Sequence, residues 1–133
     1  MPEEIEEIRV PPQTLDWSTW FPWKRLELHG SSEEGINVPP SPGIYEVKRT
    51  DQTQERLHIG QTTNLRSRIM QQLLRGVSHS TSYRIHHAFE EGTEKKELLL
   101  VRWAETEYPC CVEEVLKKRY LERFGDSPEY SRR

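Results

Sequence analysis

Long apolar runs and cysteines able to pair are both missing from this sequence. Cys110 and Cys111 are the only two cysteines, and they are adjacent on a predicted helix, where their side chains diverge. This usage favours a reducing, intracellular setting. No stretch approaches the roughly 20 apolar residues of a membrane span, and the acidic N-terminus is unlike a signal or transit peptide. We therefore expect a soluble cytoplasmic protein with no membrane partner.

Apolar residues and net positive charge are also scarce. Hydrophobic residues make up 33% of the 133 residues, which allows one domain with a modest core, and the formal net charge is −3. The charge is unevenly spread, because residues 1–35 hold eight acids and three bases, whereas residues 56–89 hold five arginines and no acid. A local basic block of this kind is the electrostatic footprint that a phosphate backbone needs.

Two short segments of alternating polarity predict a β-hairpin. Residues 44–49 and 55–59 alternate, and a polar turn separates them. Side chains two residues apart share one face of a strand. If the register brings Tyr45 and His58 to the same face, two hydrogen-bonding side chains lie together at one end of the hairpin.

Helices and a further strand are predicted after the hairpin. Residues 62–64 can cap a first helix that Gly76 stops. An apolar run at residues 98–103 predicts a third strand. Pro109 opens a last helix, whose apolar stripe, ended by Gly125, consists of Val112, Val115, Leu116, Tyr120 and Phe124. The pattern predicts an α/β fold with a small, mainly antiparallel three-stranded sheet flanked by helices.

The hairpin and first helix carry a recognisable motif. Segment 42–45 reads PGIY, segment 58–60 reads HIG, and residues 62–68 read T-x-x-L-x-x-R. This series resembles the signature of the GIY-YIG nucleases, with histidine where the second tyrosine is usual. The likeness is strongest over residues 42–69 and continues less distinctly to about residue 125. It implies metal-dependent hydrolysis of nucleic acid phosphodiester bonds, with DNA as the expected substrate.

The resemblance also implies roles for five residues. Tyr45 would act as, or position, the general base for the attacking water, helped by His58. Arg68 would neutralise the charge that grows on the phosphate. His79, at the entry of a short second helix, could orient the nucleophile or donate to a phosphate oxygen. Glu113 would hold a single Mg²⁺ or Mn²⁺.

Two choices between neighbours remain within this scheme. Geometry alone does not separate Arg66 from Arg68, but the family spacing favours Arg68. At about 100° per residue, Glu113 falls on the edge of the apolar stripe of its helix, whereas Glu114 points away. Three other arginines of the basic block, Arg66, Arg75 and Arg84, are expected to bind nucleic acid.

Departures from the family pattern support an alternative, a non-cleaving nucleic-acid-binding or protein-interaction module on the same fold. His58 replaces a tyrosine, Gln72 stands where several members keep a histidine, and the tail 127–133 lacks an asparagine that many members have. The first change need not remove activity, since histidine titrates near 6.5 and tyrosine near 10, so that histidine accepts protons more readily around neutral pH.

The N-terminal segment differs in amino-acid composition from the proposed nuclease domain at residues 42–125. Residues 1–41 gather four aromatic side chains between prolines and glycines: Trp17, Trp20, Phe21 and Trp23. Aromatic residues at this density are too apolar for a free tail. We expect this extension to pack on the domain, or to contact a protein partner or a second copy of the chain.

Overall fold

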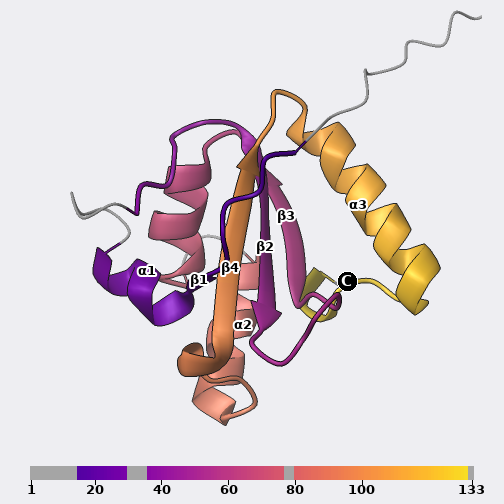
Figure 1. Ribbon diagram of the computed structural model, residues 1–133. Helices are drawn as coiled ribbons and strands as arrows, with labels where there is room; N and C mark the ends of the chain where they lie inside the picture. The colour runs from indigo at the N-terminus through magenta and orange to yellow at the C-terminus, as the bar shows by residue number, and fades with distance from the viewer. Residues whose placement is uncertain (1–14, 30–35, 77–79, 132–133) are drawn as a thin grey trace, which may run out of the picture.

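A four-stranded antiparallel sheet forms the centre of the protein. The computed structural model describes residues 15–29, 36–76 and 80–131 (Figure 1). Its strands are β1 (Phe21–Pro22), β2 (Gly43–Arg49), β3 (His58–Thr62) and β4 (Leu99–Glu105), in the spatial order β1-β4-β2-β3. The helical elements are α1 (Trp23–His29), the π-helical η1 (Ser67–Leu73), α2 (Ser80–Glu91), η2 (Lys96–Leu98), α3 (Pro109–Phe124) and η3 (Glu129–Ser131).

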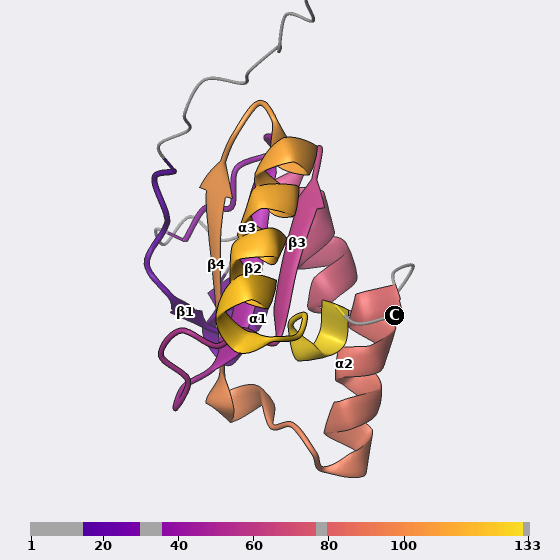
Figure 2. The same cartoon turned by 90° about the vertical axis from the view of Figure 1, so that its right-hand side faces the viewer.

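Helices cover both faces of this sheet. Helix α3 lies on one face, and α1, η1 and α2 lie on the other (Figures 1 and 2). The larger core lies on the side of η1 and α2, where Tyr45 and Val47 pack with Leu65 and Ile69. A smaller cluster joins Val112 of α3 to Ile44 and Ile59. The α/β class with a mainly antiparallel sheet is thus as predicted.

The expected number of strands was wrong, because β1 adds a fourth. Phe21 pairs with Val101 of β4, and its ring stacks on Trp103 with the centroids 5.1 Å apart. A two-residue strand is too short to show an alternating pattern. Its pairing depends on a long-range contact that local sequence does not reveal.

The N-terminal aromatic segment packs on the domain itself. Trp23 and Leu26 of α1 are fully buried in the larger core. Trp20 lies against cations of the sheet, with its ring centroid 4.5 Å from the Arg102 guanidinium and 4.7 Å from Lys48 Nζ. Such contacts contribute roughly 0.5–1 kcal/mol each at exposed sites. Residues 15–29 are therefore a structural part of the fold.

The helix that carries Arg68 is wider than an α-helix. Residues Ser67–Leu73 are π-helical, and the N–H of Leu74 donates to the carbonyl of Ile69. The expected stop is confirmed, since Gly76 has a φ of 71°, a conformation that glycine adopts without strain. Turns of π-helix are rare and occur often at functional sites.

Helix α3 begins and ends as its sequence predicts. Pro109 lies at its first turn, and Gly125 closes it with a φ of 77°. The predicted stripe is only partly right, because Val112 is buried but Val115 is 47% exposed. Within the described residues, no helix has the length and apolar content needed to cross a membrane.

Candidate active site

The register of the hairpin brings Tyr45 and His58 to one face of the sheet. Tyr45 pairs with Gly60, and His58 pairs with Val47, so the two rings lie diagonally across strands β2 and β3. His58 Nε2 is 3.2 Å from the Tyr45 hydroxyl, and the ring centroids are 5.2 Å apart. The hairpin thus has the register on which the adjacency of these two side chains depends.

Gly60 makes room for this pair. A Cβ atom at this position would lie 2.5 Å from His58 Nε2 and 2.5 Å from Cζ of Tyr45. Real Cβ atoms do not approach ring atoms so closely, and both rings are held in a packed core. The glycine of the HIG triplet is thus needed for steric reasons.

The second ring nitrogen of His58 contacts a residue that the sequence did not point to. Ser131, in the turn η3, places its Oγ 2.7 Å from His58 Nδ1. The N–H of Ile59 donates to the same oxygen at 3.3 Å, and the hydroxyl reaches the Ile59 carbonyl at 3.5 Å. The imidazole is therefore held at both nitrogens, by Tyr45 on one side and Ser131 on the other.

Tyr130 anchors the turn that carries Ser131. Its N–H donates to the carbonyl of Leu57 at 2.7 Å, and its hydroxyl donates to the Glu94 carboxylate at 3.0 Å. Glu94 is only 4% exposed, and it is paired with Arg49. Burial and the hydrogen bond to Glu94 raise the pKa of Tyr130 above its ordinary value. This network fixes η3 against strand β3.

Arg68 and Glu113 act electrostatically on the Tyr45 hydroxyl. Burial raises the pKa of Tyr45 to about 12, the charge of Arg68 and a hydrogen bond from it oppose this rise, and Glu113 adds to it. Arg68 lies on η1, on the same side of the sheet as Tyr45, whereas Glu113 belongs to α3 on the other side. The two side chains thus approach the tyrosine from different layers.

Glu113 and Glu114 of α3 differ in burial, as their positions around the helix predict. The side chain of Glu113 is half-buried, with 22% exposed, and it pairs with Lys117 at 3.6 Å. Glu114 is exposed. Among the residues that the structure describes, there is no cluster of three or more His, Cys, Asp or Glu able to hold a metal ion. Glu113 is the carboxylate that contributes to the electrostatic environment of the Tyr45 hydroxyl.

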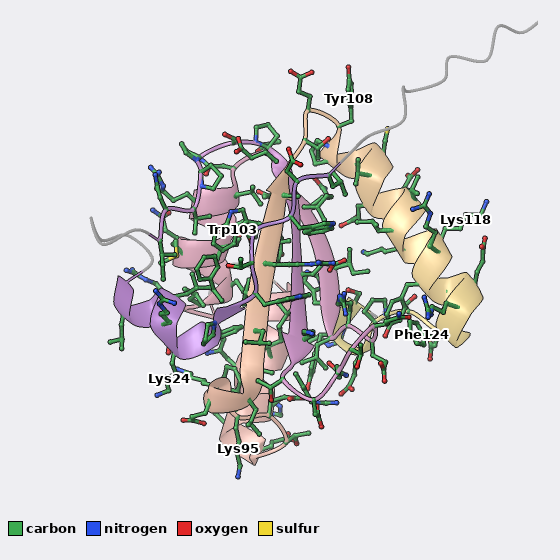
Figure 3. All side chains as sticks on the ribbon, in the orientation of Figure 1. Lys24, Lys95, Trp103, Tyr108, Lys118 and Phe124 are labelled. Carbon is green, nitrogen blue, oxygen red and sulfur yellow. The ribbon has the colours of Figure 1, made fainter. Side chains whose placement is uncertain are left out.

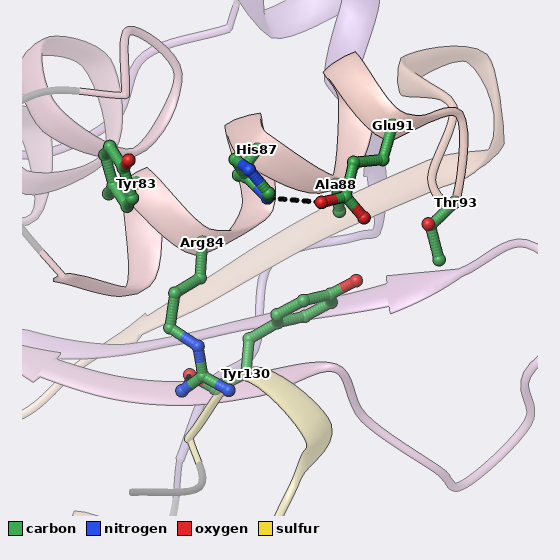
Figure 4. Close-up of a pocket in the computed structure, with 7 residues that line it drawn as sticks. All are labelled: Tyr83, Arg84, His87, Ala88, Glu91, Thr93 and Tyr130. Atoms are coloured by element: carbon green, nitrogen blue, oxygen red, sulfur yellow. Dashed lines mark hydrogen bonds and ion pairs between the residues drawn. The ribbon is translucent and has the colours of Figure 1, made fainter.

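The other expected nucleic-acid contacts lie around the helices on the side of Tyr45. Arg66 donates to the carbonyl of Val38 at 2.8 Å and to Asn37 at 2.9 Å, and Arg75 is exposed. Arg84 donates to the carbonyl of Tyr130 at 3.3 Å, beside a cavity of about 290 Å³ between α2 and η3 (Figure 4). His79 lies outside the described residues.

Comparisons with known proteins identify no relative of this chain. No family model matches the chain, and neither the curated proteins nor the solved structures contain a match. The likeness to GIY-YIG nucleases therefore depends on the motif residues, and the functional argument depends on their geometry.

Proposed function

We propose that the protein hydrolyses phosphodiester bonds of nucleic acid, with DNA as its substrate. The observation that carries this proposal is the chain of contacts from Tyr45 through His58 to Ser131, beside Arg68 and Glu113. A positive group, a carboxylate and a proton acceptor are the types that phosphate hydrolysis requires. The GIY-YIG resemblance points to the same chemistry.

Tyr45 is a poor base by itself. Its pKa of about 12 leaves only about one molecule in 10⁵ as tyrosinate at neutral pH. A proton taken up at the Tyr45 oxygen can instead move to His58 Nε2, 3.2 Å away, as the tyrosine gives up its own proton. The pair then accepts a proton from water without a free tyrosinate.

Ser131 selects the tautomer that this transfer needs. When its hydroxyl donates to the Ile59 carbonyl, its oxygen accepts a hydrogen bond from Nδ1–H of His58. The Nε2 lone pair then faces the Tyr45 hydroxyl. We assign Ser131 a positioning role, which acts through His58.

Arg68 and Glu113 complete the proposed site. Arg68 stabilises the charge that accumulates on the phosphate oxygens, an effect worth several kcal/mol when the donor is preorganised. A single carboxylate suits Mg²⁺ or Mn²⁺, which keep water and substrate phosphate oxygens as their other ligands. Bound at Glu113, such an ion would supply further stabilisation of phosphate charge.

Burial favours a second candidate, a non-cleaving nucleic-acid-binding module. Tyr45 has no exposed surface, and only 4% of His58 is exposed. Water and phosphate must reach the Tyr45 hydroxyl for catalysis, whereas a binding module has no such need. The departures from the family motif at His58 and Gln72 also support this candidate.

Plasmid nicking with Mg²⁺ and with a chelator tests the proposal. Glu113→Gln should abolish Mg²⁺-dependent nicking and leave the melting temperature nearly unchanged, whereas Glu114→Gln should do little. If the two variants exchange these effects, the ligand is Glu114. A wild type that binds DNA but does not nick it with Mg²⁺ or Mn²⁺ would support the binding module.

A further inference from the structure

A basic and aromatic groove lies between α3 and the sheet, on the face opposite Tyr45. Its cavity volume is about 230 Å³, and Ile59 and Leu116 contribute to its lining. The polar and aromatic members of the lining used below are Arg56, Arg119, Tyr120, Arg123 and Phe124. We call this region the α3 groove.

The charge of the α3 groove is positive although the chain as a whole is acidic. Glu46 is the only carboxylate in the lining; it is 4% exposed and already pairs with Arg56 and Arg102. Arg119 and Arg123 have no carboxylate partner within the part of the chain that the structure describes. These two residues therefore add two guanidinium groups without a carboxylate partner to the lining of the groove.

The mutual repulsion of the two arginines opposes the favourable interaction of Arg123, in the last turn of α3, with the helix dipole. They are four residues apart and lie on the same side of the helix, where like charges cost roughly 0.2–0.5 kcal/mol. Both are exposed. A pair of exposed cations without a carboxylate partner, both lining one cavity, suits an anionic ligand.

Two aromatic rings accompany the arginines. Tyr120 and Phe124 have ring centroids 4.5 Å apart, and Phe124 remains 38% exposed (Figure 3). The Tyr120 hydroxyl is fixed by the backbone of Arg56, from which it accepts at 3.1 Å and to which it donates at 3.2 Å. Alternating aromatic and basic side chains are the combination that binds single-stranded nucleic acid, through base stacking and phosphate contacts.

We propose that the α3 groove binds the phosphates of a single nucleic acid strand that extends from Glu113 along α3. This inference deepens the proposed function, since Glu113 lies on the same helix. At 1.5 Å per residue, Tyr120 and Arg123 are roughly 10 and 15 Å along the helix from Glu113. These distances correspond to about three or four nucleotides at roughly 3.4 Å per step. Arg119 and Arg123 would each contact one phosphate, and Phe124 would stack on a base.

Fluorescence anisotropy of a labelled single-stranded oligonucleotide, measured with a chelator and without divalent ions, tests the proposal. The double variant Arg119→Gln/Arg123→Gln should bind about tenfold more weakly at low salt. Its plot of log affinity against log salt should be shallower by about 1.4, because each phosphate contact to a single strand contributes about 0.7.

A charge-matched control separates local contacts from net charge. Lys95 is exposed and lies away from the groove, and Lys118 is exposed on α3 with its side chain directed away from the sheet (Figure 3). The double variant Lys95→Gln/Lys118→Gln therefore changes the total charge equally. This control should bind nearly as the wild type does. Equal losses in both double variants, or no loss in the arginine variant, would overturn the proposal. Displacement of the oligonucleotide by polyglutamate at equal charge concentration would also overturn it, in favour of an acidic protein partner.

The variant Glu113→Gln separates binding in the α3 groove from cleavage. Glu113→Gln should retain wild-type affinity and salt dependence in this assay while it loses nicking. Intact binding through the α3 groove without cleavage by the wild type would leave the groove assignment standing and reject the nuclease. Nicking that persists in the arginine variant, with unchanged oligonucleotide binding, would reject the groove assignment and leave the proposed nuclease standing.

Discussion

Ser131 Oγ and His58 Nδ1 are 2.7 Å apart, although the two residues are far separated in sequence. The contact ties the end of the described chain to the hairpin that carries the motif. It leaves the other imidazole nitrogen to Tyr45. A short turn thus determines how the central histidine is oriented.

Removal of the Ser131 hydroxyl should impair the candidate site more than the fold. Ser131→Ala loses one hydrogen bond, a cost of about 1 kcal/mol, but nicking should fall at least tenfold. The acid limb of the pH–rate profile should move to lower pH, because the imidazolium loses an acceptor. Ser131→Thr keeps the hydroxyl and should restore both. A Ser131→Ala enzyme with a wild-type pH profile would rule out the positioning role.

Arg68 should matter for the rate more than for binding. Arg68→Ala should lower nicking by two to three orders of magnitude, by analogy with the roughly 2.7–4 kcal/mol lost when one preorganised donor is removed. Arg66 is the natural control, since it donates to Val38 and Asn37 and should affect stability more than rate. Single-turnover rates and oligonucleotide affinities of the two variants provide the comparison. Similar rate losses in both would indicate a general basic surface.

Tyr45 should contribute to loss of stability in alkaline solution. Its pKa is raised by burial to about 12, so the unfolded chain ionises first, near pH 10. The stability due to neutral Tyr45 is therefore complete below about pH 10 and is lost as the pH rises toward 12, by on the order of 2–3 kcal/mol. Urea unfolding across this range should show a smaller loss in Tyr45→Phe than in the wild type. Equal losses would place the tyrosine in a more hydrated environment.

Gly60 should tolerate no side chain. Gly60→Ala places a Cβ against Tyr45 and His58, so we expect a destabilisation of about 1–3 kcal/mol together with loss of nicking. Gly92 is a matched control, because it has open space around its Cβ position but a φ of 80°. Gly92→Ala should cost about 1 kcal/mol through backbone strain and keep its activity. Melting curves and nicking assays distinguish the two.

Local patterns predict the parts of the site that depend on one or two neighbouring elements. The strand period of two allowed Tyr45 and His58 to share a face, but only for one register of the hairpin, which local sequence does not fix. The helical period separated Glu113 from Glu114, because backbone geometry fixes the direction of each side chain around a helix axis. The glycine that ends α3 was predictable for the same reason.

Features that depend on distant segments were not predictable. Strand β1 forms because Phe21 pairs with Val101 and stacks on Trp103. Ser131 contacts His58 because the neighbouring Tyr130 is held by a hydrogen bond to Glu94. The arginines of the α3 groove were also missed, since Arg119 and Arg123 lie outside the acid-free block. They form a basic groove only together with Arg56, which lines its other side. Trp103, which stacks on Phe21, and Glu94, which anchors Tyr130, lie too far away in sequence from these residues to form a motif.

The two outer strands leave little opportunity for another chain to extend the sheet. Strand β1 is only two residues long, and its second residue is a proline without an N–H. At the other edge, η3 occupies the Leu57 carbonyl through Tyr130 and the Ile59 N–H through Ser131. Short, proline-bearing or covered edges are the means by which natural sheets avoid edge-to-edge aggregation. Detachment of η3 would therefore release the candidate histidine and, in the same event, open strand β3 to pairing with a second molecule.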